Sequence, residues 1–410
     1  MKTYHANKRK TIAVAAVLLA VAVFVAFFGR EVAEVTRVCW CLLAGATEEP
    51  CTPDDRFHYL ESHPGEIRIA MIGNWENLRR RGMPRRQVLE TAIEDLNRAG
   101  GIAGRRLTAE WIDAAGSADA MVEAVEKVAH DPSYYAVFGP DTSGQMAVVR
   151  PLLLTYRLLT FAPTVSDVHA VQARDYPCIF LPNASDAQQV QSVIDWAKSG
   201  GRDGFLLLGE DDTSSEEFAR LAESMFDAQR ITICGRTSFV PGKDVRFFED
   251  ERKSYDDYFR SRNALVINRS TDEASVGGLV RKLLKEKSGD LFFYKLPEGT
   301  FSPEELARMF TLAHVEVDAK KMADAAHLAK IPGVRNDTFT PAAYTSVFLL
   351  ADACRKAKSL RQEEVIKALR TERLETPFRA FRFTPERFED HPGCHVISLA
   401  ELRRMQSGVK

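Results

Sequence analysis

The hydrophobic positions of the chain follow two different spacings that alternate along it. Residues 67–73 (IRIAMIG) form a mostly apolar run of strand length, and residues 86–97 carry apolar side chains at the spacing of an amphipathic helix. Glycines at positions 100, 101 and 104 follow this helix, where they can take the left-handed conformation that ends it. The order of strand, polar loop, helix and glycine stop predicts the first unit of a parallel α/β domain.

The same alternation continues through two series of segments. In the first series we expect strands and helices in turn, at residues 107–112, 118–129, 135–138, 145–153 and 158–161. The second series begins after Asp186, with helices expected at residues 187–198, 216–229 and 274–287, and strands at residues 205–208, 231–234, 264–268, 291–294 and 395–399. This pattern predicts two doubly wound α/β lobes, each with a parallel sheet covered by helices on both faces.

Ligands of such sheets bind in the loops that follow the carboxyl ends of the strands. In the first lobe these loops are residues 74–85, 140–144 and 163–167. A dinucleotide site would place its glycines between strand and helix, whereas here they follow the helix, so nucleotide binding is not expected. The formal net charge of -2 over 410 residues also lacks the basic excess of a nucleic-acid-binding protein.

The N-terminal segment predicts a membrane anchor. Residues 11–29 carry no charge and, at about 1.5 Å per residue, nearly span the roughly 30 Å of a bilayer core. Basic residues precede them without an acidic one, which places the N-terminus in the cytoplasm and the rest of the chain outside. The residues after Phe28 make a poor cleavage site. We therefore favour an uncleaved single-pass anchor in the cell membrane over a removed signal peptide, with the ligand-binding part on the extracytoplasmic (periplasmic) side.

Several motifs in a fixed order carry a resemblance to a known family. They are EIRIAMIG at residues 66–73, AIEDLNRAGGIAGRRL at 92–107, VFGPDTSGQ at 137–145, LLTFAPTVSD at 158–167, LFFYKLPEG at 291–299, MADAAHLAKIPG at 322–333 and AAYTSVFLLADAC at 342–354. Together they resemble the leucine/isoleucine/valine-binding proteins, which are type I periplasmic binding proteins that usually serve ABC importers. The resemblance covers residues 66–400.

The resemblance implies two lobes joined by three crossovers at a hinge, which close on a ligand in the cleft between them. Residues 47–64 are polar and contain prolines, which predicts a linker before the folded part. The expected boundaries are a cytoplasmic basic tail at residues 1–10, the anchor at 11–29, a juxtamembrane linker at 30–65, lobe 1 at 66–184 with its return at 326–380, and lobe 2 at 185–325 with its return and the C-terminal tail at 381–410.

The resemblance also implies a set of ligand-binding residues. Ser143 matches the serine that holds the ligand α-carboxylate, while Val165 and Ser166 match an alanine and a threonine that meet the carboxylate and the amino group. Glu298 resembles the cleft carboxylate that pairs with the ligand ammonium. Hydroxyl and N–H groups suit a buried carboxylate, and one acid offsets the cost of burying an amine. Other roles stay open: Ser143 is also placed to cap the following helix, Ser166 to form a turn, and Glu298 to lie in a solvated loop.

The chain departs from the family pattern in the first ligand loop. Five arginines lie within residues 79–86, where family members commonly have an aromatic residue, and we expect Trp75 to supply the aromatic wall instead. We expect these arginines to form a solvated basic loop; the alternative, in which Arg81 is a ligand-binding residue, is that they favour a ligand with extra negative charge, an acidic partner or a lipid head group. Residues 211–214 of the second lobe also lack the usual aromatic, so a leucine-type specificity is not expected.

The cysteines predict buried thiols. Positions matching a family disulfide hold Ala115 and Thr142, so both cysteines of that bridge are absent. Isolated cysteines are commonly buried thiols, and we expect this state for four of them: Cys178, Cys234, Cys354 and Cys394.

The sequence does not predict an enzyme. It contains no GxSxG, HExxH or P-loop motif, and the residues His391 to His395 are better explained by a Pro-Gly turn than by a metal site. We expect no metal and no cofactor. The resulting prediction is an extracytoplasmic solute-binding protein for a small amino acid or related carboxylate, with an ABC permease or a membrane sensor as partner. The alternative is a membrane-anchored sensor or protein-interaction module with a degenerate pocket; a hydrolase has the least support.

Overall fold

A computed structural model of the chain describes residues 49–80, 83–114, 116–166, 178–201, 204–210, 213–239, 264–268, 281, 284–285, 290–293, 301–313, 327–331, 340–378, 380–383 and 395–407. The chain divides into two compact units, residues 1–50 and residues 51–410, and every named helix and strand belongs to the second. The predicted membrane anchor at residues 11–29 lies outside the described residues. Within the described ranges, no helix has the length and apolar character needed to cross a membrane.

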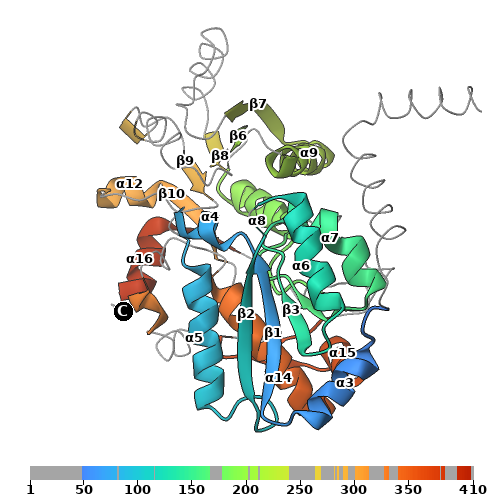
Figure 1. Cartoon of the computed structure of the whole chain (residues 1–410). Coiled ribbons are helices and arrows are strands. Elements are labelled where there is room, and N and C mark those ends of the chain that lie inside the picture. The colour runs from blue at the N-terminus through green and yellow to red at the C-terminus, as the bar shows by residue number, and fades with distance from the viewer. Residues whose placement is uncertain are drawn as a thin grey trace, which may run out of the picture. The chain divides into compact units, whose positions relative to one another are not determined.

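The first sheet is parallel, as the sequence predicts. Its strands have the order β2-β1-β3-β4-β5. Figure 1 shows β2, β1 and β3 side by side. They are β1 (Glu66–Gly73), β2 (Arg106–Asp113), β3 (Tyr134–Phe138), β4 (Thr160–Phe161) and β5 (Ile179–Phe180). The carboxyl ends of β1, β3 and β4 are therefore neighbours.

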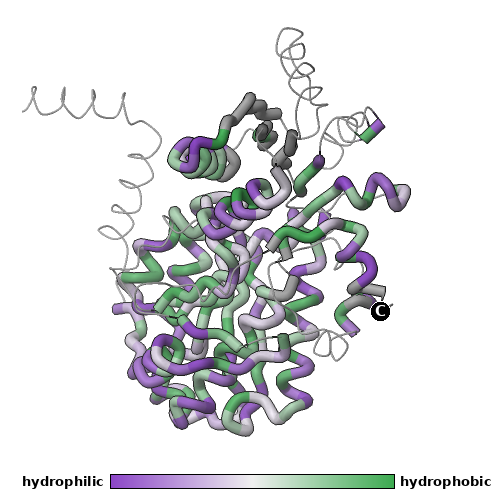
Figure 2. Tube along the Cα trace, turned by 180° about the vertical axis from the view of Figure 1, so that it is seen from behind, coloured by the Kyte–Doolittle hydropathy of each residue, from purple (hydrophilic) through white to green (hydrophobic). Residues whose placement is uncertain are grey.

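Both faces of this sheet are buried. Along β1, Ile67, Ile69 and Met71 belong to one apolar cluster that includes residues of α5 (Arg85–Arg98) and α14 (Thr340–Ala357). Ala70 and Ile72 are equally buried but lie outside that cluster, because successive side chains of a strand point to opposite faces. The second face is covered by α6 (Ala118–Ala129), which contacts β1 and packs against α7 (Ser143–Thr155). Figure 2 shows the resulting alternation of hydrophobic and hydrophilic positions along the chain.

The chain returns to the first sheet after building the second one. Helix α14 packs against α5 and against α15 (Gln362–Thr371). The segment before it contains a short 3-10 turn, η2 (Leu328–Lys330), and the segment after it a small antiparallel pair, β11 (Leu374–Glu375) with β12 (Ala380–Phe381).

The second sheet has the order β13-β10-β9-β8-β6-β7. Its strands are β6 (Gly204–Glu210), β7 (Thr232–Phe239), β8 (Ala264–Asn268), β9 (Asp290–Phe293), β10 (Met309–Ala313) and β13 (His395–Ser398), with helices α8 (Asp186–Ser199), α9 (Thr213–Ala228), α12 (Pro303–Ala307) and α16 (Leu399–Ser407). The prediction of a purely parallel sheet is wrong at one edge, since β13 pairs antiparallel to β10. The chain reaches β13 from the first lobe rather than through a strand-helix-strand crossover, so the parallel direction is not imposed.

The predicted linker contains a docked helix, which corrects the sequence interpretation of residues 47–64. Helix α3 (Pro53–Ser62) begins with a capping box between Thr52 and Asp55 and with proline at its first position. Arg56 on this helix is 1% exposed. Its guanidinium donates to four backbone carbonyls at 2.6 to 3.1 Å, those of Val128, Ala129, Asp131 and Tyr134. The sequence pattern misses this helix because its main anchor is a charged residue, which pattern analysis assigns to the surface.

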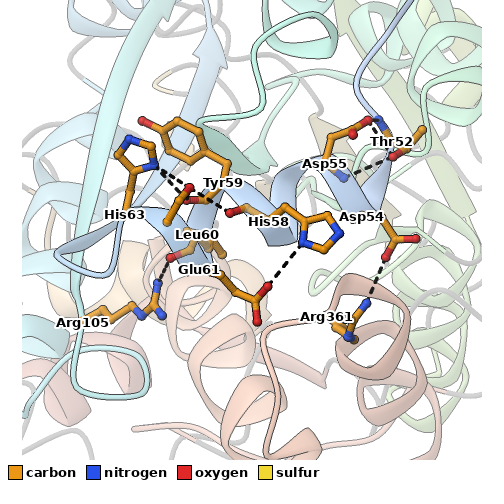
Figure 3. A network of polar contacts seen from close by, with 11 residues as sticks. Thr52, Asp54, Asp55, His58, Tyr59, Leu60, Glu61, His63, Arg105 and Arg361 are labelled. Atoms are coloured by element: carbon orange, nitrogen blue, oxygen red, sulfur yellow. Dashed lines mark hydrogen bonds and ion pairs between the residues drawn. The ribbon is translucent and has the colours of Figure 1, made fainter.

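The outer contacts of α3 also fix it to the first lobe. Arg361 pairs with Asp54 at 3.1 Å, and Arg105 donates to the carbonyl of Leu60 at 2.6 Å (Figure 3). The contacts of α3 with α15 and β3 complete the attachment. The folded part therefore begins about one helix earlier than the sequence predicts.

Candidate functional site

The candidate site is built from loops at the carboxyl ends of β1, β3 and β4. After β3 the backbone passes through a cis Gly139-Pro140 bond and enters α7. Gly139 has φ +120°, and a Cβ there would lie 2.0 Å from the carbonyl oxygen of Ile72. Only glycine fits this approach between two strand ends.

Ser143 is the first residue of α7, and its neighbour Thr142 is the N-cap. The Thr142 hydroxyl accepts from the Gln145 N–H at 3.2 Å. The helix cap that the sequence analysis considered for Ser143 is therefore supplied by Thr142. Ser143 is buried, and its hydroxyl oxygen accepts from the N–H of Ser166 at 3.4 Å, a long hydrogen bond.

Val165 and Ser166 lie in the loop after β4, and both are buried. The N–H of Val165 donates to the carbonyl of Ala162 at 3.3 Å, so this loop turns tightly after the strand. The carbonyl of Ser166 accepts from the N–H of Asp186 at 2.8 Å, where α8 begins. The structure thus brings Ser143 and Ser166 together and ties their loop to the start of the second lobe.

A buried ion pair stands beside the two serines. Arg85, at the start of α5, donates to Oδ1 of Asp141 at 2.7 Å, and each residue is 7% exposed. The hydroxyl of Thr164 donates to the carbonyl of Asp141 at 2.6 Å and lies 3.3 Å from its Oδ1. None of these three residues has a ligand role in the sequence prediction. Arg85 was one of five arginines in a run, and nothing in the run itself separates the buried one from the exposed ones.

Trp75 is a core residue in this structure, in contrast to the expectation that it forms an aromatic wall. The loop after β1 contains a short helix, α4 (Trp75–Arg80), instead of continuous loop. The indole is 7% exposed, its N–H donates to the carbonyls of Met71 and Ile112, and its ring meets Trp111 edge-on at 4.9 Å. Trp75 is buried instead of lining the site because two backbone acceptors and a second indole hold its ring against the sheet.

Two predicted ligand residues, Arg81 and Glu298, lie outside the described residues. Of the arginines around Arg81, Arg79 pairs with Glu76 at 2.7 Å and Arg86 with Glu90 at 2.9 Å, both on the surface. These two arginines therefore belong to a solvated basic segment, while Arg85 does not.

The described cysteines agree with the prediction of buried thiols where it can be tested. Cys178 and Cys354 are free and buried, and burial raises the pKa of the Cys354 thiol to about 12. Cys394 is outside the described residues. Across the ranges that the structure describes, no group of three or more histidine, cysteine, aspartate or glutamate side chains could hold a metal ion.

The comparisons with known proteins agree with this fold. A sequence profile of the family described as periplasmic binding protein matches residues 79–246. The Leu/Ile/Val-binding protein BraC3 of Rhizobium johnstonii is 23% identical over 306 residues, covering 70% of this chain and 78% of that protein.

Solved structures are similar in fold. A substrate-binding protein of an ABC transporter from Desulfitobacterium hafniense, in complex with Leu, has a TM-score of 0.64 at 17% identity, covering 81% of this chain and 96% of its own. A solute-binding protein of an ABC transporter from Rhodopseudomonas palustris, in complex with 3,4-dihydroxybenzoic acid, has a TM-score of 0.64 at 13% identity, covering 81% and 93%. These comparisons confirm the predicted resemblance: the chain is similar to Leu/Ile/Val-binding proteins and to other periplasmic binding proteins, and it has their type I α/β fold.

Proposed function

We propose that the chain is an extracytoplasmic solute-binding protein that captures a small amino acid or a related carboxylate and delivers it to an ABC importer. The observation that carries this proposal is the meeting of Ser143 and Ser166, which lie 23 positions apart in the sequence and share a hydrogen bond at the carboxyl edge of the sheet. Ligands of parallel α/β sheets bind at this edge. The relatives named above are binding proteins, which supports a function without bond chemistry.

The proposed site holds a carboxylate with neutral donors. The proposed anion lies at the start of α7, where the Ser143 hydroxyl, the backbone N–H groups and the positive end of the helix dipole all favour negative charge. The hydroxyl of Ser166 supplies a second donor, since its N–H already donates to the Ser143 hydroxyl, and Val165 lies in the same loop. In the proposal Glu298 pairs with the ligand ammonium from the second lobe, and Arg81 lies at the rim.

Lobe closure is the proposed mechanism. The ligand binds the closed state better than the open one and so shifts the population between them. The proposed lobes are residues 66–184 with 326–380, and residues 185–325 with 381–410. Residues 11–29 anchor the chain in the cell membrane, so that the binding part stays next to the importer.

One observation favours a second candidate, a membrane-anchored sensor or interaction module that reuses the fold. Trp75 is in the core, so this side chain does not give the site an aromatic wall. A site without an apolar wall holds aliphatic ligands weakly, since burial of apolar area supplies most of their affinity.

A ligand screen of the full chain in detergent tests the two candidates. A ligand at about one hundred times its dissociation constant stabilises the folded state by roughly 2.7 kcal/mol, which a thermal melt detects. We expect a hit among amino acids and small carboxylates, and we expect Ser143→Ala to weaken it about tenfold or more.

The matched control is Thr142→Ala, the neighbouring residue on the same helix. Thr142 is exposed and caps α7, so its loss costs about 1 kcal/mol of stability but leaves the ligand affinity unchanged. Equal loss of affinity in both variants would show that ligand binding depends on the N-terminus of α7 in general and not on the Ser143 side chain. A panel without any hit would favour the interaction module.

A further inference from the structure

The carboxylate of Asp141 is fixed in position from several sides. Its Oδ1 receives the guanidinium of Arg85 at 2.7 Å and lies 3.3 Å from the hydroxyl of Thr164. Its N–H donates to the side chain of Gln145 at 3.2 Å, and its carbonyl accepts from Thr164 at 2.6 Å. Three elements therefore hold one acidic residue: the start of α5, the first turn of α7 and the loop after β4.

The second oxygen of this carboxylate is different. Among the described residues, Oδ2 of Asp141 has no hydrogen-bond partner, although an ionised carboxylate offers about four acceptor positions. Nor does Oδ2 belong to the polar atoms that are fully buried without a partner, so the small exposure of the side chain includes this oxygen. Oδ1 is therefore held by two neighbours, whereas Oδ2 is partly exposed and has acceptor positions that no described residue fills.

This acceptor lies next to the proposed carboxylate site. Asp141 precedes Ser143 by two residues and Thr164 precedes Ser166 by two, so the ion pair and the serine pair come from the same two loops. Residues two apart in a chain have Cα atoms at most about 7 Å apart. The carboxylate of Asp141 and the serine pair therefore belong to one small region at the carboxyl edge of the sheet.

Stability alone does not explain the pair. Replacing a buried ion pair by apolar residues of similar volume is often neutral or stabilising, because desolvation offsets the attraction. A carboxylate held at one oxygen and open at the other is instead suited to receive a donor, and a charged donor makes the stronger hydrogen bond.

We propose that Asp141 is a specificity-determining residue whose Oδ2 binds the ammonium of the ligand, with Arg85 and Thr164 as positioning residues. This inference rests on the proposed function and narrows it: the ligand is an amino acid rather than a plain carboxylate. The acid acts from the first lobe, in addition to the predicted Glu298 of the second.

The test compares matched acids with and without the amine, on the full chain in detergent, by calorimetric titration. The probe pairs are alanine with propanoate, leucine with isocaproate, and glutamate with glutarate. We expect at least one amino acid to bind about tenfold or more tightly than its partner, and Asp141→Asn to remove most of this ratio while leaving the affinity for the plain acid within about threefold. Asp113→Asn, at the exposed end of β2, is the control with the same change of charge and should keep the ratio.

Each outcome has a distinct meaning. Equal affinity for both members of every pair would overturn the role of Asp141 while the carboxylate-binding function stands. A folded Asp141→Asn variant that keeps the wild-type ratio would also overturn it. If that variant does not fold, Thr164→Val takes its place, because it removes a contact that positions the Asp141 carboxylate and should lower the ratio; an unchanged ratio in this variant would overturn the role of Asp141. Binding of neither member would remove the proposed function together with this inference.

Discussion

Two arginines of the first lobe are buried, and the structure compensates their charges in opposite ways. Arg56 inserts from α3 among four backbone carbonyls at the end of α6 and the start of β3, and no carboxylate of the described residues pairs with it. Arg85 donates to a carboxylate, that of Asp141, at the carboxyl edge of the same sheet. Burial lowers the pKa of Arg56, and the carbonyls at a helix C-terminus stabilise its charge.

The difference separates an arginine that holds two elements of the fold together from one that lies beside the proposed ligand site. Backbone carbonyls accept from both terminal nitrogens of Arg56, while its buried Nε has no hydrogen-bond partner among the described residues, so this residue holds α3 to the first lobe. A carboxylate partner is itself an acceptor, and Arg85 leaves one of its oxygens open. The two arginines should therefore differ in how much their substitution lowers the free energy of unfolding. They should also differ in whether a second substitution can recover that stability.

The largest effect is expected for Arg56→Met. Four carbonyls would lose a charged donor, and we expect the free energy of unfolding to fall by about 3 to 5 kcal/mol, measured by urea titration with tryptophan fluorescence. The control is Arg361→Met, which removes an exposed ion pair to Asp54 and a contact with the ring of Phe57 at 4.1 Å, and should cost about 0.5 kcal/mol. A similar cost for both variants would show that α3 is not anchored through Arg56.

The next effect concerns Arg85→Met, which leaves the Asp141 carboxylate buried without its cation. We expect a loss of about 3 kcal/mol, and we expect Asp141→Leu added to it to recover at least half. Arg56 offers no such repair, because its partners are backbone groups. Strictly additive costs in this double-mutant cycle would contradict the pairing.

The loops of the proposed ligand site also require a particular backbone conformation. Gly139 has φ +120°, and in Gly139→Ala the new Cβ would clash with the carbonyl of Ile72. We expect the free energy of unfolding, measured by urea titration, to fall by about 2 kcal/mol or more. Gly144→Ala is the matched control, since nothing lies within 4 Å of the added methyl, and it should change stability by less than about 1 kcal/mol. A mild effect at Gly139 would mean that the loop can move away from β1.

The smallest effect is a pH dependence near the first strands. Lys127, with Tyr134 and Arg68, holds the pKa of Glu110 at about 2, below its usual value of 4.5. A depressed carboxyl pKa contributes stability above the unfolded pKa, and this contribution is lost as the pH falls from 4.5 toward 2. Because Glu110 is partly exposed, we expect only about 1 kcal/mol. Near pH 7 the free energy of unfolding of the wild type should exceed that of Glu110→Gln by this amount. The difference should shrink toward zero as the pH approaches 2. A difference that stays constant with pH would contradict the lowered pKa of Glu110.

The alternation of strands and helices and the family resemblance can both be predicted from the amino-acid sequence. Strand β8 and helix α6 have the predicted bounds, because their apolar spacing and turn residues are local properties of the chain. The left-handed glycines after α5 also lie where the pattern places them. The motifs around Ser143 and Ser166 were sufficient to bring attention to the two loops that the structure joins.

Which of these residues are buried, and which residues they contact, depends on the tertiary structure. The sequence does not distinguish Arg85 from Arg79 or Arg86, since burial depends on contacts with Asp141, 56 residues away. It assigns residues 47–64 to a linker, because α3 is held by carbonyls that are distant in sequence, at the end of α6 and the start of β3. It offers Ser143 as a possible cap of α7, whereas the structure gives this role to Thr142, and it places Trp75 at the site instead of in the core. Local pattern records what each residue prefers, whereas burial and pairing are set by segments that meet only in the folded chain.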